Sequence, residues 1–239
     1  MRPVLFILIL GIAASAWAAY FFLGDLAEDE NMVILREFSE NIQVLEPGAI
    51  AGNAIHQTDL GLLYLTSHEL VRDSVKAVMW LDRAATQGNA RAQYRLGRLY
   101  ELGSGVRKDY AEAARWYDRA AKMARYPDAE YALGRLYTRG LGVGPSTASA
   151  MEWYRKAANG GQPVAQYLTG KMYESGYGIR KNLIQAYVWY SLAAESREVV
   201  LAEDTDYDPN IALARLGKVM NQSQKDAGVR LLKQWKPTH

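Results

Sequence analysis

The sequence predicts an all-α protein in which a solenoid of helix-turn-helix repeats lies behind an N-terminal membrane span. Three observations lead to this prediction. Tryptophan, tyrosine, glycine and alanine recur at nearly constant intervals through the middle of the chain, each interval holds two stretches with helical periodicity, and the first residues include a long run without charge. Repeated helical units bury their apolar faces by stacking on their neighbours, as in helical solenoids.

The composition fits a folded chain and excludes several kinds of site. The 239 residues are 49% hydrophobic and 23% charged, which is typical of a globular protein. No cysteine is present, so disulfides, thiolate zinc sites and cysteine nucleophiles are excluded. The 28 Lys and Arg against 26 Asp and Glu give a net charge of +2. Because nucleic-acid-binding proteins carry a strong basic excess, we expect no nucleic-acid partner.

The first element is an uncharged run of 20 residues, 4–23, that follows Arg2. A helix of that length spans roughly 30 Å, the thickness of the hydrocarbon core of a bilayer. Residues 1–23 therefore predict a signal anchor, or alternatively a signal peptide cleaved at the small-residue sites Ala14–Ala16 or Ala16–Ala18. We favour the anchor, because cleavage would expose the apolar residues 20–23 at the new N-terminus. A buried core helix is the third interpretation, which the lack of a polar face disfavours.

The charges on either side of this run predict its orientation. Arg2 precedes the run, and the acidic residues Asp25, Glu28, Asp29 and Glu30 follow it. Since basic residues stay on the cytoplasmic side, the N-terminus is expected in the cytoplasm and residues 24–239 outside it. The predicted location is the inner (cytoplasmic) membrane with a single pass. The alternative, after cleavage, is a secreted or periplasmic protein.

Residues 24–51 are expected to form an acidic juxtamembrane helix or N-terminal cap. Residues 24–58 hold seven acids and one base, whereas residues 59–239 hold 19 acids and 26 bases. The predicted helix either docks on the first repeat or extends the solenoid away from the membrane. Its apolar stripe consists of Val33, Ile34, Phe38, Ile42 and Leu45.

Four copies of one unit fill residues 52–196. A tyrosine, a glycine and three alanines recur in every copy at fixed places relative to one tryptophan, and one extra residue lies in the loop 122–127. Matches in register at this many positions exclude coincidence. The tryptophans, at spacings of 36, 37 and 36 residues, are Trp80, Trp116, Trp153 and Trp189.

Each copy is expected to contain two helices separated by a glycine turn. In the second copy the turn is Gly103-Ser104-Gly105, which suits a helix that ends through positive φ. Polar residues that cap helix N-termini precede the second helices, at Asp73, Asp109, Ser146 and Asn182. Capping-box spacing is present in Asp109–Glu112 and Asn182–Gln185. The first helices are expected to begin after Asn53 and Asn89, or with Pro127 and Pro163.

These residues resemble a known repeat. The segments Ala92–Tyr100, Gly103–Asp109 and Trp116–Ala121 are similar in order and content to the Sel1-like repeat (SLR), a family related to the tetratricopeptide repeats. The resemblance covers residues 52–196 and implies a right-handed superhelical α-solenoid whose first helices line a binding groove. The first copy departs from the family pattern at residues 67–69 and the third at residues 144–146, where the glycine turn or its basic pair is replaced.

Residues 197–239 are expected to form an acidic linker and a C-terminal capping helix pair. The linker carries the acids of residues 203–208. Pro209 is at a first helical position, and Asn221 with Gln224 begins the second helix. A terminal helix pair of this kind is common among members of the family that the repeats resemble.

Known catalytic motifs are missing, so we predict a protein that is not an enzyme and needs no metal or cofactor. His68-Glu69 lacks the second histidine of a zinc protease, and Gly170-Lys171 lacks the upstream glycine of a phosphate-binding loop. The resemblance implies a membrane-anchored envelope scaffold for protein partners. The alternatives are a glycan- or peptidoglycan-binding module and, ranked below it, a β-lactamase-like hydrolase. The hydrolase ranks last because family members described in that way use paired cysteines.

Candidate binding residues are the polar and aromatic positions of the first helices. Arg98, Arg135 and Lys171 occupy one column of the repeat, where the first copy has Leu62, and the candidate groove tyrosines are Tyr94, Tyr131 and Tyr167. The cations predict a positive stripe that attracts an acidic segment, either of an envelope protein or of this chain's residues 24–46. The alternative is an ordinary solvated helix face.

Overall fold

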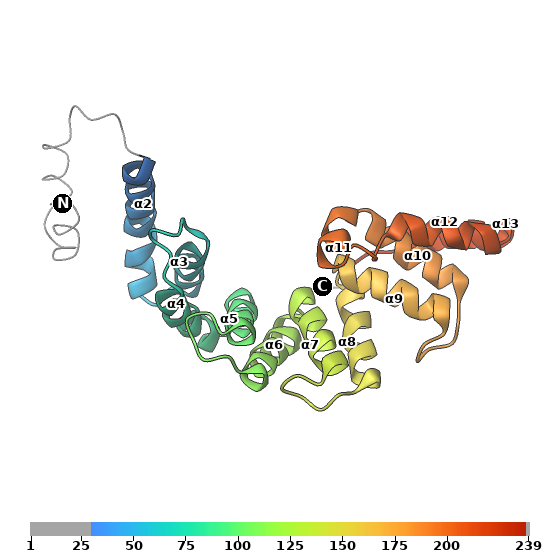
Figure 1. The fold of residues 1–239 in the computed structure, drawn as a ribbon, viewed down its shortest axis with the longest axis horizontal. Coiled ribbons are helices and arrows are strands. Elements are labelled where there is room, and N and C mark those ends of the chain that lie inside the picture. The colour runs from blue at the N-terminus through green and yellow to red at the C-terminus, as the bar shows by residue number, and fades with distance from the viewer. Residues whose placement is uncertain (1–29, 238–239) are drawn as a thin grey trace, which may run out of the picture.

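The computed structural model describes residues 30–237, and this part of the chain is entirely helical, as predicted (Figure 1). The predicted membrane span, residues 4–23, lies outside the described residues. Within residues 30–237 no helix combines the length and apolarity that crossing a bilayer requires. The helices are α2 Glu30–Ile50, α3 Ala54–Thr66, α4 Ser74–Thr86, α5 Ala90–Leu102, α6 Tyr110–Ala124, α7 Pro127–Arg139, α8 Thr147–Asn159, α9 Pro163–Ser175, α10 Leu183–Ala194, α11 Arg197–Glu203, α12 Pro209–Val219 and α13 Gln222–Gln234.

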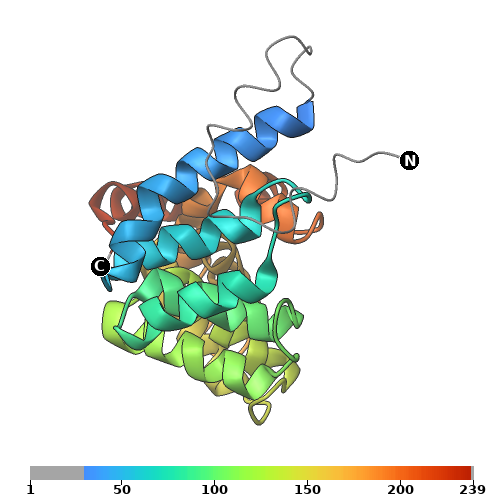
Figure 2. The same cartoon turned by 90° about the vertical axis from the view of Figure 1, so that its left-hand side faces the viewer.

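The helices form a solenoid. The pairs α3/α4, α5/α6, α7/α8 and α9/α10 are the four repeats, and the second helix of each pair also packs on the first helix of the next. Seen from the α2 end, successive helices are stacked in chain order (Figure 2). The stack bends into an arch that is open between α2 and α11 (Figure 1).

Glycine allows the two helices of each repeat to approach closely. A Cβ atom at Gly97 would lie 2.7 Å from the Tyr117 ring, and one at Gly170 would lie 2.8 Å from the Tyr190 ring. Both rings are completely buried. A large side chain on the second helix therefore packs directly on the backbone of the first, which explains the recurring glycine.

The caps and turns follow the sequence pattern, but the capping boxes expected at Asp109–Glu112 and Asn182–Gln185 do not form. The Asp73, Asp109, Ser146 and Asn182 side chains accept backbone N–H groups at the starts of α4, α6, α8 and α10, and Gly103, Gly140 and Gly176 end α5, α7 and α9 with positive φ. The backbone N–H groups of Asp109 and Asn182 donate to the carbonyls of Tyr100 and Tyr173, both at 2.9 Å, and so do not bind Glu112 or Gln185. A reciprocal box is present at Asn221–Gln224.

At the N-terminal end, α2 docks on the first repeat. The Phe38 and Tyr64 ring centroids are 5.5 Å apart in an edge-to-face contact. Ile42 and Leu45 pack against the same buried cluster, which includes Trp80. Of the two arrangements expected for this helix, the structure therefore has the docked one.

The C-terminal end contains a helix that the sequence pattern does not predict. Residues 197–203 form α11, where an irregular linker was expected. Val200 is its buried anchor, and Arg197 donates to both Asp208 carboxylate oxygens, at 3.1 and 2.6 Å. A helix of this length is too short to show a hydrophobic period, which is why it was missed. The two helices that follow, α12 and α13, both pack on α10.

Candidate functional site

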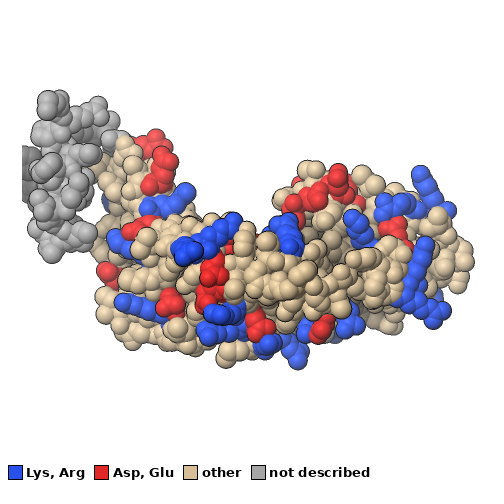
Figure 3. Space-filling view, turned by 60° about the horizontal axis from the view of Figure 1, so that its bottom comes forward, with Lys and Arg blue, Asp and Glu red and all other residues tan. Residues whose placement is uncertain are grey.

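The six candidate residues lie on the first helices α5, α7 and α9. We call the side of the array formed by α3, α5, α7 and α9 the hollow face. At its C-terminal end, α11 packs on α9 and the loop after α11 contacts the same helix. In the space-filling view the array is hollowed between its α2 end and the raised α11 end, which carries acidic side chains (Figure 3).

In the fourth repeat the candidate tyrosine is part of the core. Tyr167 is only 5% exposed, so this candidate groove tyrosine presents little surface to a ligand. Its ring lies 5.2 Å from that of Tyr190 and stacks at 4.9 Å on Tyr207, which comes from the loop between α11 and α12. The Lys171 ammonium lies 5.3 Å from the centre of the Tyr207 ring. The chain's own loop therefore contacts both candidate residues of this repeat, of which Lys171 remains exposed.

In the third repeat both candidates also have partners within the chain. The Tyr131 hydroxyl donates to the Glu203 carboxylate at 2.8 Å, and Arg135 Nη2 donates to the Glu101 carboxylate at 2.6 Å. Burial raises the pKa of Tyr131, and the Glu203 carboxylate raises it further. The hydroxyl therefore keeps its proton and acts as a donor. Arg135, with 24% of its side chain exposed, is not a freely solvated cation.

In the second repeat the candidates remain open. Tyr94 packs beside Tyr117 and Tyr126, with ring centroids 5.8 and 5.4 Å away. Burial raises the pKa of Tyr94, with Asp128 adding to the rise and the Arg98 guanidinium opposing it. Arg98 is exposed and has no ion pair among residues 30–237. Arg98 and Lys171 are therefore the two exposed cations of the column, and of these Lys171 lies over the Tyr207 ring.

A glutamate column, not recognised in the sequence, decides which cations are paired. Glu101 accepts the Tyr117 hydroxyl at 2.6 Å and also holds Arg135 of the next repeat. Glu174 accepts the Tyr190 hydroxyl at 2.8 Å and two Arg215 nitrogens at 2.7 Å. The hydrogen bond from Arg215 lowers the pKa of Glu174, and burial opposes that shift.

The same column explains the unpaired cations. The first and third copies have Leu65 and Thr138 where the others have glutamate. The cation of the next repeat, Arg98 or Lys171, therefore meets no carboxylate from this column. The signal in the sequence is a glutamate 34 residues before the cation, as in Glu101 and Arg135.

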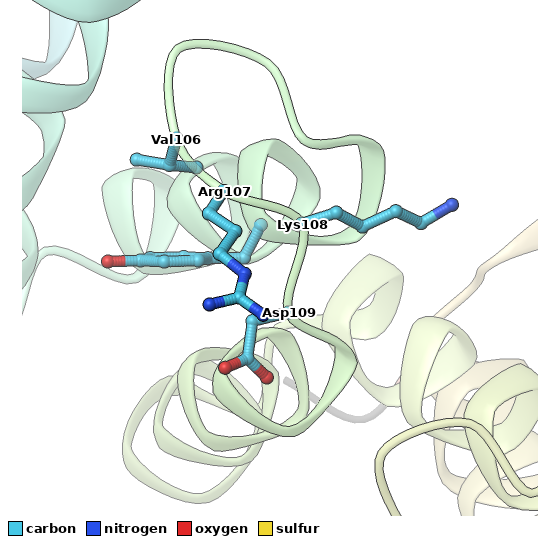
Figure 4. A pocket seen from close by; sticks show the side chains of 5 residues that line it. Val106, Arg107, Lys108 and Asp109 are labelled. Atoms are coloured by element: carbon cyan, nitrogen blue, oxygen red, sulfur yellow. The ribbon is translucent and has the colours of Figure 1, made fainter.

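Small surface pockets at two repeat turns are structural. One is lined by Tyr100 and residues 106–109, and its counterpart in the fourth repeat by Tyr173 and residues 179–182. In the first pocket Lys108 points away, and Asp109 lies at the start of α6 (Figure 4). The Asp109 carboxylate already accepts the N–H groups of Ala111 and Glu112, so these two donors are not free to bind a small anion. In the part of the chain that the structure describes, no group of three or more His, Cys, Asp or Glu is placed to bind a metal.

Comparisons with known proteins point to one repeat family. Residues 57–89, 90–124, 127–162 and 163–197 each match the family model described as Sel1 repeat. A Sel1 repeat protein from Oxalobacter formigenes has a similar solved structure, with 29% sequence identity and a TM-score of 0.58 over 70% of each chain. A protective antigen of uropathogenic Escherichia coli strains, described as having an SLR fold, is 23% identical with a TM-score of 0.48, over 91% of this chain and 51% of that one. No curated protein matches the sequence.

Proposed function

The chain belongs to the Sel1 repeat family, and we propose that it is a scaffold that binds a protein partner on the N-terminal half of its hollow face. Proteins with Sel1 repeats generally mediate protein–protein interactions. The observation that carries the proposal is the difference between equivalent positions. Tyr131, Arg135, Tyr167 and Lys171 all contact other parts of the chain, whereas Arg98 is exposed beside Tyr94 and forms no ion pair with a described residue.

The packing of the tyrosines favours a protein partner over a glycan. Glycan-binding surfaces present aromatic faces to the ligand. Here Tyr167 is buried, and the Tyr131 hydroxyl is bonded to Glu203. The N-terminal half of the hollow face, which we call the open half, offers the Arg98 guanidinium beside the Tyr94 phenol. This pair suits a carboxylate on a peptide.

Site-specific photo-crosslinking in living cells tests this function. A benzophenone amino acid would replace Leu102 in the full chain, which is 62% exposed on α5 one turn after Arg98, so that Arg98 itself stays intact. A matched variant would carry it at Met123, which is 72% exposed at the end of α6 in the same repeat. We expect an adduct with another protein from position 102 and little from position 123. Adducts from position 123 alone would place the binding surface on the second helices and overturn the proposal.

We further propose that residues 4–23 anchor the scaffold in the cytoplasmic membrane, with residues 24–239 on the outer side, in the cell envelope. The support is the uncharged run, the single Arg2 before it and the acids after it. N-terminal sequencing and carbonate extraction test the anchor. A start at Met1 with retention in the membrane pellet supports it, and a start at Ala19 with release into the soluble fraction refutes it.

A further inference from the structure

The segment from Glu203 to Tyr207 lies on the C-terminal half of the hollow face. It comes from outside the four repeats, yet it lies on the candidate columns of two of them. Its first residue, Glu203, accepts the Tyr131 hydroxyl, and its last, Tyr207, stacks on Tyr167 beneath Lys171. Between them lie Asp204 and Asp206. An acidic stretch that ends in an aromatic ring is thus the chain's own occupant of the C-terminal half.

The open half presents the same groups one repeat earlier. Tyr94 and Arg98 on α5 correspond in the repeat to Tyr131 and Arg135 on α7. Arg135 is held by Glu101, but Arg98 follows Leu65 and keeps its guanidinium exposed. No described residue forms an ion pair with Arg98. A carboxylate of a partner placed here would therefore accept a charge-assisted hydrogen bond from the Arg98 guanidinium.

The charge around Tyr94 also favours an acidic ligand. Arg95 and Arg98 lie near its ring, and Arg91, on the same helix, lies near the adjacent Tyr126. The facing acids are Asp59, which pairs with Arg91 at 3.1 Å, and Asp128, whose carboxylate is near Arg95 and Arg98. Three positive against two negative groups leave an excess of one cation. Moreover, Nε of Arg95 is buried without a hydrogen-bond partner, so this cluster is not internally satisfied.

We propose that the open half of the hollow face, around Tyr94 and Arg98, binds an acidic segment of a partner protein that carries an aromatic residue a few positions after a carboxylate, in the manner of this chain's own residues 203–207. The carboxylate receives hydrogen bonds from the Tyr94 hydroxyl and the Arg98 guanidinium, and the partner's aromatic ring packs on the tyrosines of the face. This inference rests on the proposed scaffold function and specifies the chemistry of the partner.

A peptide titration tests the proposal. The probe is a fluorescent synthetic peptide with the sequence of residues 201–208, added to the full-length protein in detergent. We expect saturable binding that weakens with salt, about tenfold weaker binding for Arg98→Glu, and nearly unchanged binding for Arg98→Lys. A matched charge reversal, Arg155→Glu on the exposed face of α8, should leave binding unchanged. Circular dichroism of each variant shows that the helices are intact.

Two altered peptides separate the two parts of the recognition. Replacing all carboxylates by amides should abolish binding, and replacing the tyrosine by serine should weaken it several-fold, since stacking on an aromatic ring is worth about 1 kcal/mol. Equal effects of Arg98→Glu and Arg155→Glu, or undiminished binding of the amide peptide, would overturn the proposal. If position 102 crosslinks to a protein in cells but this peptide does not bind, the acidic-segment inference fails and the scaffold function stands.

Discussion

The two halves of the hollow face are built from the same residue columns and yet differ in what they offer to a ligand. In the third and fourth repeats Tyr131 and Tyr167 contact α11 and its loop, Lys171 lies over the Tyr207 ring, and Arg135 is held by Glu101. In the second repeat Arg98 is exposed. The difference does not come from the columns themselves. It comes from a residue in the preceding repeat and from a segment outside the array, so identical repeat positions acquire different roles.

The largest expected effect tests whether both halves share one core. Trp116 and Trp189 occupy the same column and are 5% and 6% exposed. We expect Trp116→Ala and Trp189→Ala each to lower the free energy of unfolding by about 3–5 kcal/mol, measured by urea denaturation. A loss below about 0.5 kcal/mol for either variant, as at surface positions, would show that the two halves are not packed alike.

A second pair of variants measures how firmly the two glutamates hold their cations. Glu101→Ala leaves Arg135 half-buried without its carboxylate, whereas Glu174→Ala leaves Arg215, whose side chain is 54% exposed, free to hydrate. Both variants also remove the acceptor of a buried tyrosine hydroxyl. We expect losses of about 2–3 kcal/mol for Glu101→Ala and about 1–2 kcal/mol for Glu174→Ala. The reverse order in chemical denaturation would contradict the pairing described above.

A third test concerns Glu130, at the boundary between the halves. The equivalent residues Gln57, Gln93 and Gln166 each donate to a carbonyl of the preceding helix, at 2.9, 3.0 and 3.4 Å. Glu130 is buried, and burial raises the pKa of its carboxyl to about 7, with Lys156 and Arg125 opposing the shift. A carboxyl can donate as glutamine does only when it is protonated.

The sign of the pH dependence follows from this shift. Because the pKa is higher in the folded than in the unfolded chain, the folded state binds the extra proton, and Glu130 costs stability progressively as the pH rises from about 4.5 to 7. Glu130→Gln should remove this dependence and raise the free energy of unfolding by about 1–3 kcal/mol at pH 8, with little effect at pH 4. Denaturation curves of both proteins across this range measure it. An equal effect at both pH values would mean that the carboxyl does not titrate between folded and unfolded states.

The smallest expected effect comes from extending the glutamate column. Thr138→Glu would place a carboxylate near Tyr154 and Lys171, as Glu101 is placed near Tyr117 and Arg135. Since the site is exposed, we expect a gain of about 0–1 kcal/mol in the free energy of unfolding at low salt, lost at high salt. Thr138→Gln, which has the same shape without the charge, is the control. A gain that salt does not reduce would point to packing and not to an ion pair.

The helices and their repeats could be predicted from the sequence, but which residues of the hollow face are buried or paired could not. Trp80, Trp116, Trp153 and Trp189, the glycine turns and the N-caps are local or periodic signals, so the helices and repeats could be predicted. The burial of Tyr167 could not, because it depends on Tyr207, 40 residues later, returning through α11 to stack on it. The different pairing of the three cations could not be predicted either. Only the packing shows that Arg135 reaches Glu101, whereas the residue equivalent to Glu101 in the repeat before Arg98 is Leu65.

The N-cap position of α7 holds an aromatic residue where the other repeats have a capping side chain. In the other three repeats this position holds Asn53, Asn89 or Gln162, and each side chain caps its helix. Tyr126 makes no such bond, and its ring instead packs at a tilt against Tyr94. A missing cap costs about 1 kcal/mol, and this cost falls beside the tyrosine of the open half. At Tyr126 the chain therefore carries a residue that stabilises its helix less than its counterparts do and adds an aromatic ring next to Tyr94 and Arg95.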